Sequence, residues 1–105
     1  MARTTGGDAV GRDEVKAILE SNRAELRRFH VKSLALFGSV ARDEAVPGSD
    51  IDVLMEFDGP ATFDMYMDLK FFLEDLLLMP IDLVMRSAVR PRLLPFIERD
   101  ILYVA

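Results

Sequence analysis

Cysteine is absent from this chain of 105 residues, so neither a disulfide framework nor a thiolate zinc site can form. Long hydrophobic runs are absent too, since no apolar stretch approaches the roughly 20 residues that a membrane-spanning helix needs. The first residues, MARTTGGDAVG, lack the hydrophobic centre of a signal peptide. These absences favour a cytoplasmic protein that has no membrane partner.

Positive charge is in short supply. Lys and Arg total 13 against 18 Asp and Glu, which gives a net charge of −5. Sequence-independent binding to nucleic acid depends on Lys and Arg side chains that neutralise phosphates, so this balance argues against direct nucleic-acid binding. It is compatible with a small anionic ligand that is carried with metal ions, or with a basic protein partner.

Half of the residues are hydrophobic, which predicts one compact domain, residues 12–105, after a flexible tail of residues 1–11. Apolar spacing predicts an α/β fold whose small sheet of three or more strands is flanked by helices. The predicted elements are a helix from the N-cap Asp13 to about His30, strand Val31–Phe37, a short helix Ser39–Ala45, strand Ile51–Phe57, a helix from Thr62 or Asp64 to about Leu78, strand Ile81–Met85, a helix Pro91–Glu98 and an extended end at Ile101–Val104.

Three aspartates interrupt the apolar strands. Asp50 and Asp52 alternate around Ile51, and Asp82 lies within Ile81–Met85. Asp is depleted in strands, and an ionised carboxylate in an apolar setting is disfavoured unless it is paired or metal-bound. Asp50 and Asp52 share one face because side chains alternate, and Asp82 joins them if its strand lies alongside. Oxygen ligands without His or Cys indicate Mg²⁺ or Mn²⁺.

The turn at Gly38-Ser39 complements these carboxylates. A helix that starts directly after a strand offers free backbone N–H groups to a phosphate. Gly38 allows close approach of the backbone, the Ser39 hydroxyl adds a hydrogen bond, and Arg42, one helical turn further on, is expected to reach the same phosphates. Together with the aspartates, the turn predicts a site for a metal–nucleoside triphosphate.

Each residue also has a plain structural interpretation. Asp50 is suited to capping the turn after Gly48-Ser49, and Ser39 is an ordinary helix N-cap. Arg42 is equally suited to a surface salt bridge. Asp52 and Asp82 have weaker structural explanations, because both lie inside apolar runs.

The spacing Gly38-Ser39, ten residues, Asp50-Ile51-Asp52 resembles the signature of the DNA-polymerase-β-type nucleotidyltransferase superfamily. More narrowly, GSVARDEAVPGSDIDVLMEF followed by PIDLV and RPRLLPFIERDILYV resembles the minimal nucleotidyltransferase (MNT) domain proteins. The resemblance extends from about Val31 to Val104. It implies a polymerase-β-like nucleotidyltransferase fold.

The resemblance also implies an activity and a partner. MNT proteins are the antitoxins of HEPN–MNT toxin–antitoxin pairs, and they are similar to enzymes that transfer AMP from ATP to a tyrosine of the HEPN RNase toxin. A hetero-oligomer with that toxin is expected. By the same resemblance, Asp50 and Asp52 bind two Mg²⁺ ions, Asp82 helps to hold the catalytic ion and accepts a proton, and Gly38 and Ser39 contact the triphosphate.

One position departs from the family pattern. Asp43 follows the Ala-Arg pair where the family commonly has Gly, so its charge either weakens ATP binding or points outward without effect. Two other functions compete with adenylyl transfer to a toxin. The first is an antitoxin that neutralises its toxin by binding alone, and the second is nucleotide transfer to RNA or a small molecule.

Overall fold

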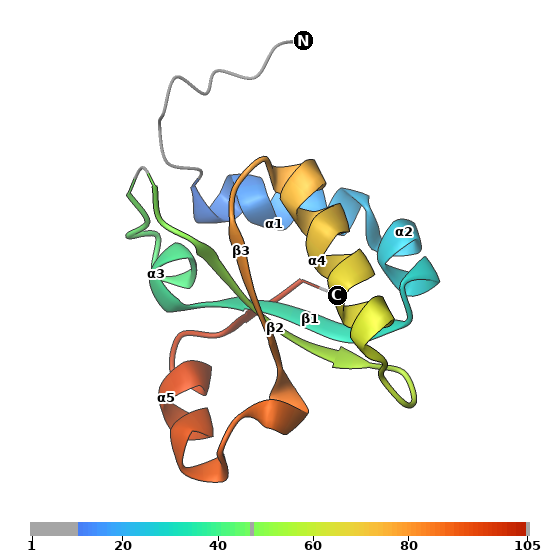
Figure 1. The fold of residues 1–105 in the computed structure, drawn as a ribbon. Coiled ribbons are helices and arrows are strands. Elements are labelled where there is room, and N and C mark those ends of the chain that lie inside the picture. The colour runs from blue at the N-terminus through green and yellow to red at the C-terminus, as the bar shows by residue number, and fades with distance from the viewer. Residues whose placement is uncertain (1–10, 47, 105) are drawn as a thin grey trace, which may run out of the picture.

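The computed structural model describes residues 11–46 and 48–104, and most of the predicted tail, residues 1–10, lies outside them (Figure 1). No helix in the described part of the chain is long and apolar enough to cross a membrane. The elements in chain order are α1 (Arg12–Ser21), α2 (Arg23–Arg28), β1 (Val31–Phe37), α3 (Gly38–Ala41), β2 (Ile51–Phe57), α4 (Phe63–Leu77), β3 (Ile81–Met85), the 3₁₀ helices η1 (Arg86–Ala88) and η2 (Pro91–Leu93), α5 (Leu94–Glu98) and β4 (Leu102–Tyr103).

The sheet is mixed and its strands are ordered β3-β2-β1-β4. β2 pairs antiparallel with β1 and parallel with β3, and β4 pairs antiparallel with β1. A parallel pair needs a crossover connection, which α4 supplies between β2 and β3. The predicted α/β fold with a small mixed sheet is confirmed, and the extended end predicted after Ile101 forms the short fourth strand.

The core lies between the sheet and the helices α1, α2 and α4, which cover one side of it, whereas α5 lies on the other side (Figure 1). Alternation along β2 directs Val53 and Met55 into this core, where they are fully buried. Leu69, Leu73 and Leu77 follow at helical spacing and form the buried stripe of α4. Because Asp52 alternates with Val53, its side chain is on the opposite face of the sheet from the core.

The predicted bounds of the three main strands are confirmed, and Thr62 is the N-cap of α4, where its hydroxyl accepts a hydrogen bond from the Met65 backbone N at 3.1 Å. The first predicted helix is wrong in two respects. Its N-cap is Gly11, not Asp13, and it breaks at Asn22 into α1 and α2. The Asn22 side chain donates to the carbonyl of Ile18 at 2.8 Å, and such side-chain bonds to the backbone compete with helix continuation.

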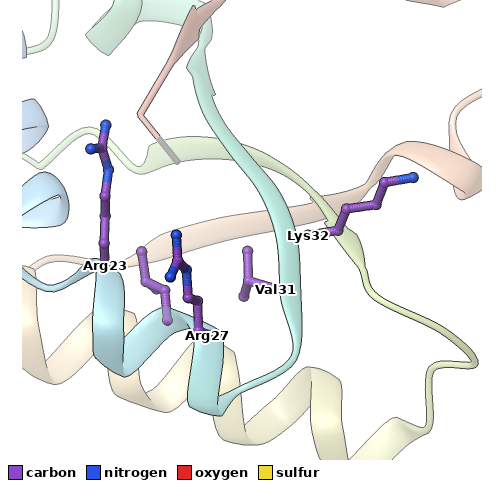
Figure 2. Close-up of a pocket in the computed structure, with 5 residues that line it drawn as sticks. Arg23, Arg27, Val31 and Lys32 are labelled. Atoms are coloured by element: carbon purple, nitrogen blue, oxygen red, sulfur yellow. The ribbon is translucent and has the colours of Figure 1, made fainter.

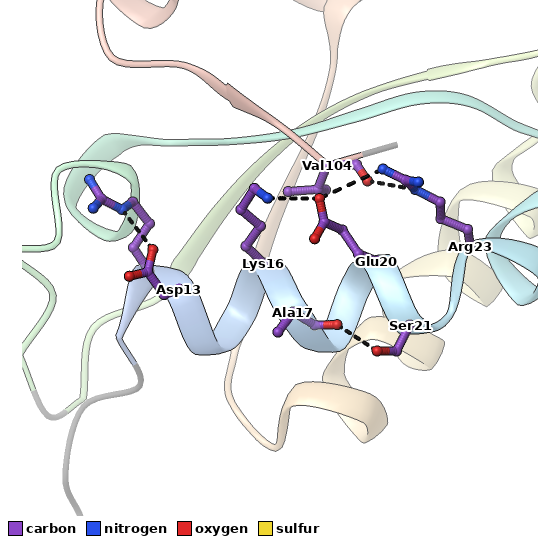
Figure 3. Close-up of polar contacts among 8 residues, drawn as sticks. Asp13, Lys16, Ala17, Glu20, Ser21, Arg23 and Val104 are labelled. Carbon is purple, nitrogen blue, oxygen red and sulfur yellow. Dashed lines mark hydrogen bonds and ion pairs between the residues drawn. The ribbon is translucent and has the colours of Figure 1, made fainter.

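Polar contacts tie α1 and α2 to the end of the chain (Figure 3). Lys16 donates to Glu20 at 2.8 Å, and Glu20 also lies 3.6 Å from Arg23. Arg23 in turn donates to the backbone oxygen of Val104 at 3.2 Å. The segment after β4 is thereby held against the helices.

Two further helical predictions need correction. The short helix comprises Gly38–Ala41 instead of Ser39–Ala45, because the chain turns at Asp43, which has a left-handed φ of 59°. The predicted helix Pro91–Glu98 divides into η2 and α5, and Pro95 lies in the first turn of α5, where its missing N–H is tolerated. Arg86 of η1, a turn that was not predicted, anchors α5 by donating to Glu98 at 2.7 Å.

Candidate active site

Asp52 and Asp82 form the centre of the site. They are direct partners in the parallel register of β2 and β3, so their side chains leave the same face of the sheet on neighbouring strands. The pKa of Asp52 is raised to about 6, first by partial burial and then by the charge of Asp82 and a hydrogen bond with it. Two carboxylates so close together oppose each other's ionisation. The predicted meeting of these two aspartates is confirmed.

Gly38 forms one wall of this site. Its φ is 69°, and a Cβ built on it would lie 3.0 Å from the Asp52 Cγ and overlap the Asp52 Oδ2. Phe37, the preceding residue, is the register partner of Asp52 in β1. Only glycine both adopts this φ readily and leaves space for the carboxylate. The Gly-Ser turn and the aspartate pair are therefore in direct contact.

Asp50 lies outside the strand, and it is more exposed to solvent than Asp52 is. It is exposed and precedes β2, and its charge also raises the pKa of Asp52, although less than burial and Asp82 do. Within residues 11–46 and 48–104, no three carboxylate or imidazole side chains are arranged to hold a metal ion together. The structure thus preforms the pair Asp52–Asp82, and a shared metal site that includes Asp50 stays a prediction.

The donor set fits a divalent cation. Carboxylate oxygens on adjacent strands are ligands that Mg²⁺ accepts, and a cation between them would remove the repulsion that raises the pKa of Asp52. Ser39 lies in the first turn of α3, and Phe37, not Ser39, is the N-cap. Ser39 is next to Gly38, which is compatible with the predicted contact between Ser39 and a triphosphate, and that contact stays a prediction.

Arg42 is held by acidic side chains. Its Nε donates to Glu44 at 2.9 Å, and its guanidinium lies 3.8 Å from Asp100. The charge of Arg42 also lowers the pKa of Asp52, which is the smallest of the effects on that carboxylate. Arg42 is therefore near the aspartates and engaged in the salt bridges that its alternative interpretation predicts. Sequence analysis missed Asp100, because no local pattern connects two residues so far apart in the chain.

Asp43 caps the first helix of the fold. Its Oδ1 accepts a hydrogen bond from the backbone N of Arg12 at 3.0 Å, which satisfies one of the free donors at the start of α1. Its φ of 59° explains a preference for Gly at this position, since Asp is one of the few other residues that tolerate left-handed backbone. The Asp43 carboxylate, whose charge was expected either to weaken ATP binding or to point outward, is thus bonded to the backbone of α1.

Comparison with known proteins identifies the class. The family model for the nucleotidyltransferase domain matches residues 15–104, so this chain belongs to the nucleotidyltransferase domain family. A relative from Methanocaldococcus jannaschii, assigned as a protein adenylyltransferase, is 40% identical over 93 residues, which cover 87% of this chain and 95% of the relative. The protein adenylyltransferase MntA of Thermococcus cleftensis is 36% identical over 93 residues, with 88% and 94% covered.

Solved structures narrow the class to the minimal nucleotidyltransferases. One structure assigned as a minimal nucleotidyltransferase superposes with a TM-score of 0.79 at 31% identity, covering 91% of this chain and 98% of that one. A chain from the complex of a tri-AMPylated HEPN toxin with its MNT antitoxin, from Shewanella oneidensis, superposes with a TM-score of 0.62 at 18% identity. That superposition covers 86% of this chain and 71% of the other, and shows a shared fold.

Proposed function

We propose that this protein is an antitoxin that transfers AMP from ATP to a tyrosine hydroxyl of a HEPN-type toxin. The observation that carries the proposal is the Asp52–Asp82 pair, set side by side by the parallel register and packed against Gly38. The relatives named as protein adenylyltransferases support AMP as the transferred group. The MNT–HEPN complex, which has the same fold, supports a HEPN protein as the acceptor.

The reaction is an in-line displacement at the α-phosphorus of ATP. The acceptor oxygen forms a bond to the α-phosphorus, the bond from that phosphorus to the bridging oxygen of the β-phosphate breaks, and pyrophosphate leaves. The proton of the acceptor hydroxyl passes to a carboxylate, and exposed Asp82 is the member of the pair that a large substrate can reach. Positioning of the reactants and stabilisation of charge supply most of the catalysis.

Asp52 and Asp82, with Asp50 beside them, would hold divalent cations in this site. When bound, two such ions supply charge stabilisation for the attacking and leaving oxygens. Two features of the chain prepare the site. Gly38 has no side chain, so the triphosphate can approach the backbone of the turn, and the strand β2 holds Asp52 in a defined position. Arg42 can contribute to phosphate binding once its bonds with Glu44 and Asp100 are exchanged for bonds with the nucleotide.

The proposal is tested by co-expressing the protein with a candidate HEPN-type toxin, purifying the complex and measuring transfer of radiolabelled AMP from ATP. The variants Asp52→Asn and Asp82→Asn should each lower the initial rate by about 100-fold or more, because charge stabilisation in the site is lost. Asp75→Asn, an exposed position on α4, makes the same chemical change away from the site and should label the toxin at the wild-type rate. EDTA should stop labelling, and Mg²⁺ or Mn²⁺ should restore it.

Other results would decide between the competing functions. Equal labelling by wild type and Asp52→Asn would contradict the catalytic assignment. A variant that labels nothing but still rescues growth from the toxin would show that neutralisation depends on binding alone. Label that appears in added RNA, and not in the HEPN protein, would replace the proposed acceptor.

A further inference from the structure

A hollow of about 230 Å³ lies between α2 and the start of β1, lined by Arg23, Leu26, Arg27, Val31 and Lys32 (Figure 2). β1 begins at this hollow and ends at Phe37, the register partner of Asp52. A strand of this length spans about 20 Å, so the hollow is separate from the aspartate pair.

The hollow carries positive charge on an acidic protein. Arg23 and Arg27 are four residues apart on α2, and Figure 2 shows both guanidinium groups rising on the same side of the helix. Like charges at this spacing destabilise a helix unless something neutralises them. Arg23 has Glu20 and the Val104 oxygen as partners, whereas Arg27 has no partner among the described residues.

The side chains at the floor of the hollow have no acceptor atoms for the guanidinium N–H groups of Arg23 and Arg27. Leu26 is 1% exposed and Val31 is partly buried, and both side chains are apolar. Lys32 lies at the rim with its side chain directed away from the arginines (Figure 2). Its ammonium also has no partner among the residues described. An anion that enters the hollow would therefore meet guanidinium donors without displacing an internal acceptor from Arg27.

We propose that this hollow binds a small phosphate-bearing anion through Arg27 and Arg23. Arg27 contributes its full positive charge to the hollow, and Arg23 contributes a charge that Glu20 only partly neutralises. Their combined charge is larger than the single negative charge of a carboxylate, and it suits the roughly −1.5 to −2 charge of a phosphate monoester. The planar fork of Arg donates two parallel hydrogen bonds to such an oxyanion. The site is independent of the catalytic aspartates and does not depend on the proposed reaction.

The test uses the ¹⁵N-labelled protein in EDTA, so that no metal can recruit phosphate to the aspartates. Inorganic pyrophosphate, AMP and citrate are titrated separately, and the amide and arginine Nε signals are followed by NMR. Pyrophosphate and AMP should shift the signals of Arg23, Arg27 and Val31. Arg27→Gln should weaken binding by about tenfold or more, because a charge-assisted hydrogen bond is lost.

Arg28→Gln is the matched control. Arg28 is the next residue, it is paired with Glu25 at 3.6 Å and it does not line the hollow, so its loss should change affinity by less than about twofold. Arg27 is exposed, and thermal unfolding of the variant confirms that it folds. Equal weakening by both substitutions would overturn the proposal. Three other results would also overturn it. The first is a set of shifts confined to residues outside the hollow, and the second is citrate binding as tight as that of pyrophosphate. The third is binding of an RNA oligomer by a protein that binds neither pyrophosphate nor AMP.

Discussion

At the scale of single residues, the contact between Gly38 and Asp52 joins the two halves of the site. Gly38 meets two demands at once, a φ of 69° and the absence of a Cβ where the Asp52 carboxylate lies. The first demand concerns the backbone and the second concerns space. These demands can be separated, because Gly59 has a φ of 104° and nothing within 4 Å of the position of a Cβ.

We expect Gly38→Ala to cost more stability than Gly59→Ala. Both substitutions pay about 1 kcal/mol or more for a left-handed alanine, but only Gly38→Ala also displaces the Asp52 carboxylate. Urea unfolding of the two variants measures the difference, and AMP transfer should be lost only in Gly38→Ala. Equal destabilisation of both variants would show that the close approach to Asp52 carries no energetic weight.

At the scale of elements, the segment after α3 connects the candidate active site to the first helix. Asp43 ends α3 with a left-handed turn, and its carboxylate caps α1 through the Arg12 backbone N. Arg42 and Glu44 on either side of it form the salt bridge beside the aspartates. The short helix α3, four residues long, is therefore fixed at its C-terminal end by contacts of the residues that follow it.

Three substitutions of Asp43 separate its conformational, capping and electrostatic roles. Asp43→Ala should destabilise the protein by about 1–2 kcal/mol, because it loses the cap and forces alanine into left-handed backbone. Asp43→Gly loses only the cap and should cost less, whereas Asp43→Asn keeps an acceptor and should be close to wild type. Thermal unfolding ranks the three variants. If Asp43→Asn also leaves the KM for ATP unchanged, the charge at this position does not compete with phosphate; a lowered KM would show that it does.

At the scale of the whole molecule, the aspartate pair links stability to pH. The pKa of Asp52 is about 6 in the folded protein, raised from 3.8 by burial and by Asp82 and Asp50. The folded state thus binds this proton more tightly than the unfolded state does. Its contribution to stability is complete below about pH 3.8 and is lost as the pH rises through 6.

We therefore expect Asp52→Asn to stabilise the metal-free protein at neutral pH. In EDTA at pH 7.5 its Tm should exceed that of the wild type by roughly 2–5 °C, a modest gain because Asp52 is only partly buried and solvent screens its charge. At pH 4 the two proteins should unfold at nearly the same temperature. Differential scanning calorimetry at both pH values measures this, and a Tm difference that does not depend on pH would contradict the cause assigned to the pKa shift.

The sequence by itself determined the three main strands and the positions of the aspartates that interrupt their apolar pattern. The bounds of β1, β2 and β3 follow from short apolar runs that end at glycine, proline or charged residues, and these signals are local. The spacing from Gly38-Ser39 to Asp50 and Asp52 is local as well, because it spans only α3, the loop that follows it and the start of β2. The intrusion of Asp82 into an apolar run was enough to predict a partner for Asp52.

Only the tertiary structure decided which of these residues meet. The direct pairing of Asp52 with Asp82 depends on the register that the α4 crossover imposes on β2 and β3, and it leaves Asp50 outside the preformed pair. The approach of Asp100 to Arg42 joins residues that no periodic pattern connects. The hollow at Arg23 and Arg27 exists because the chain breaks at Asn22 and packs α2 against β1. Local sequence patterns determine which face of each helix or strand is apolar. Which of these faces come into contact depends on strand register and on packing across the whole chain.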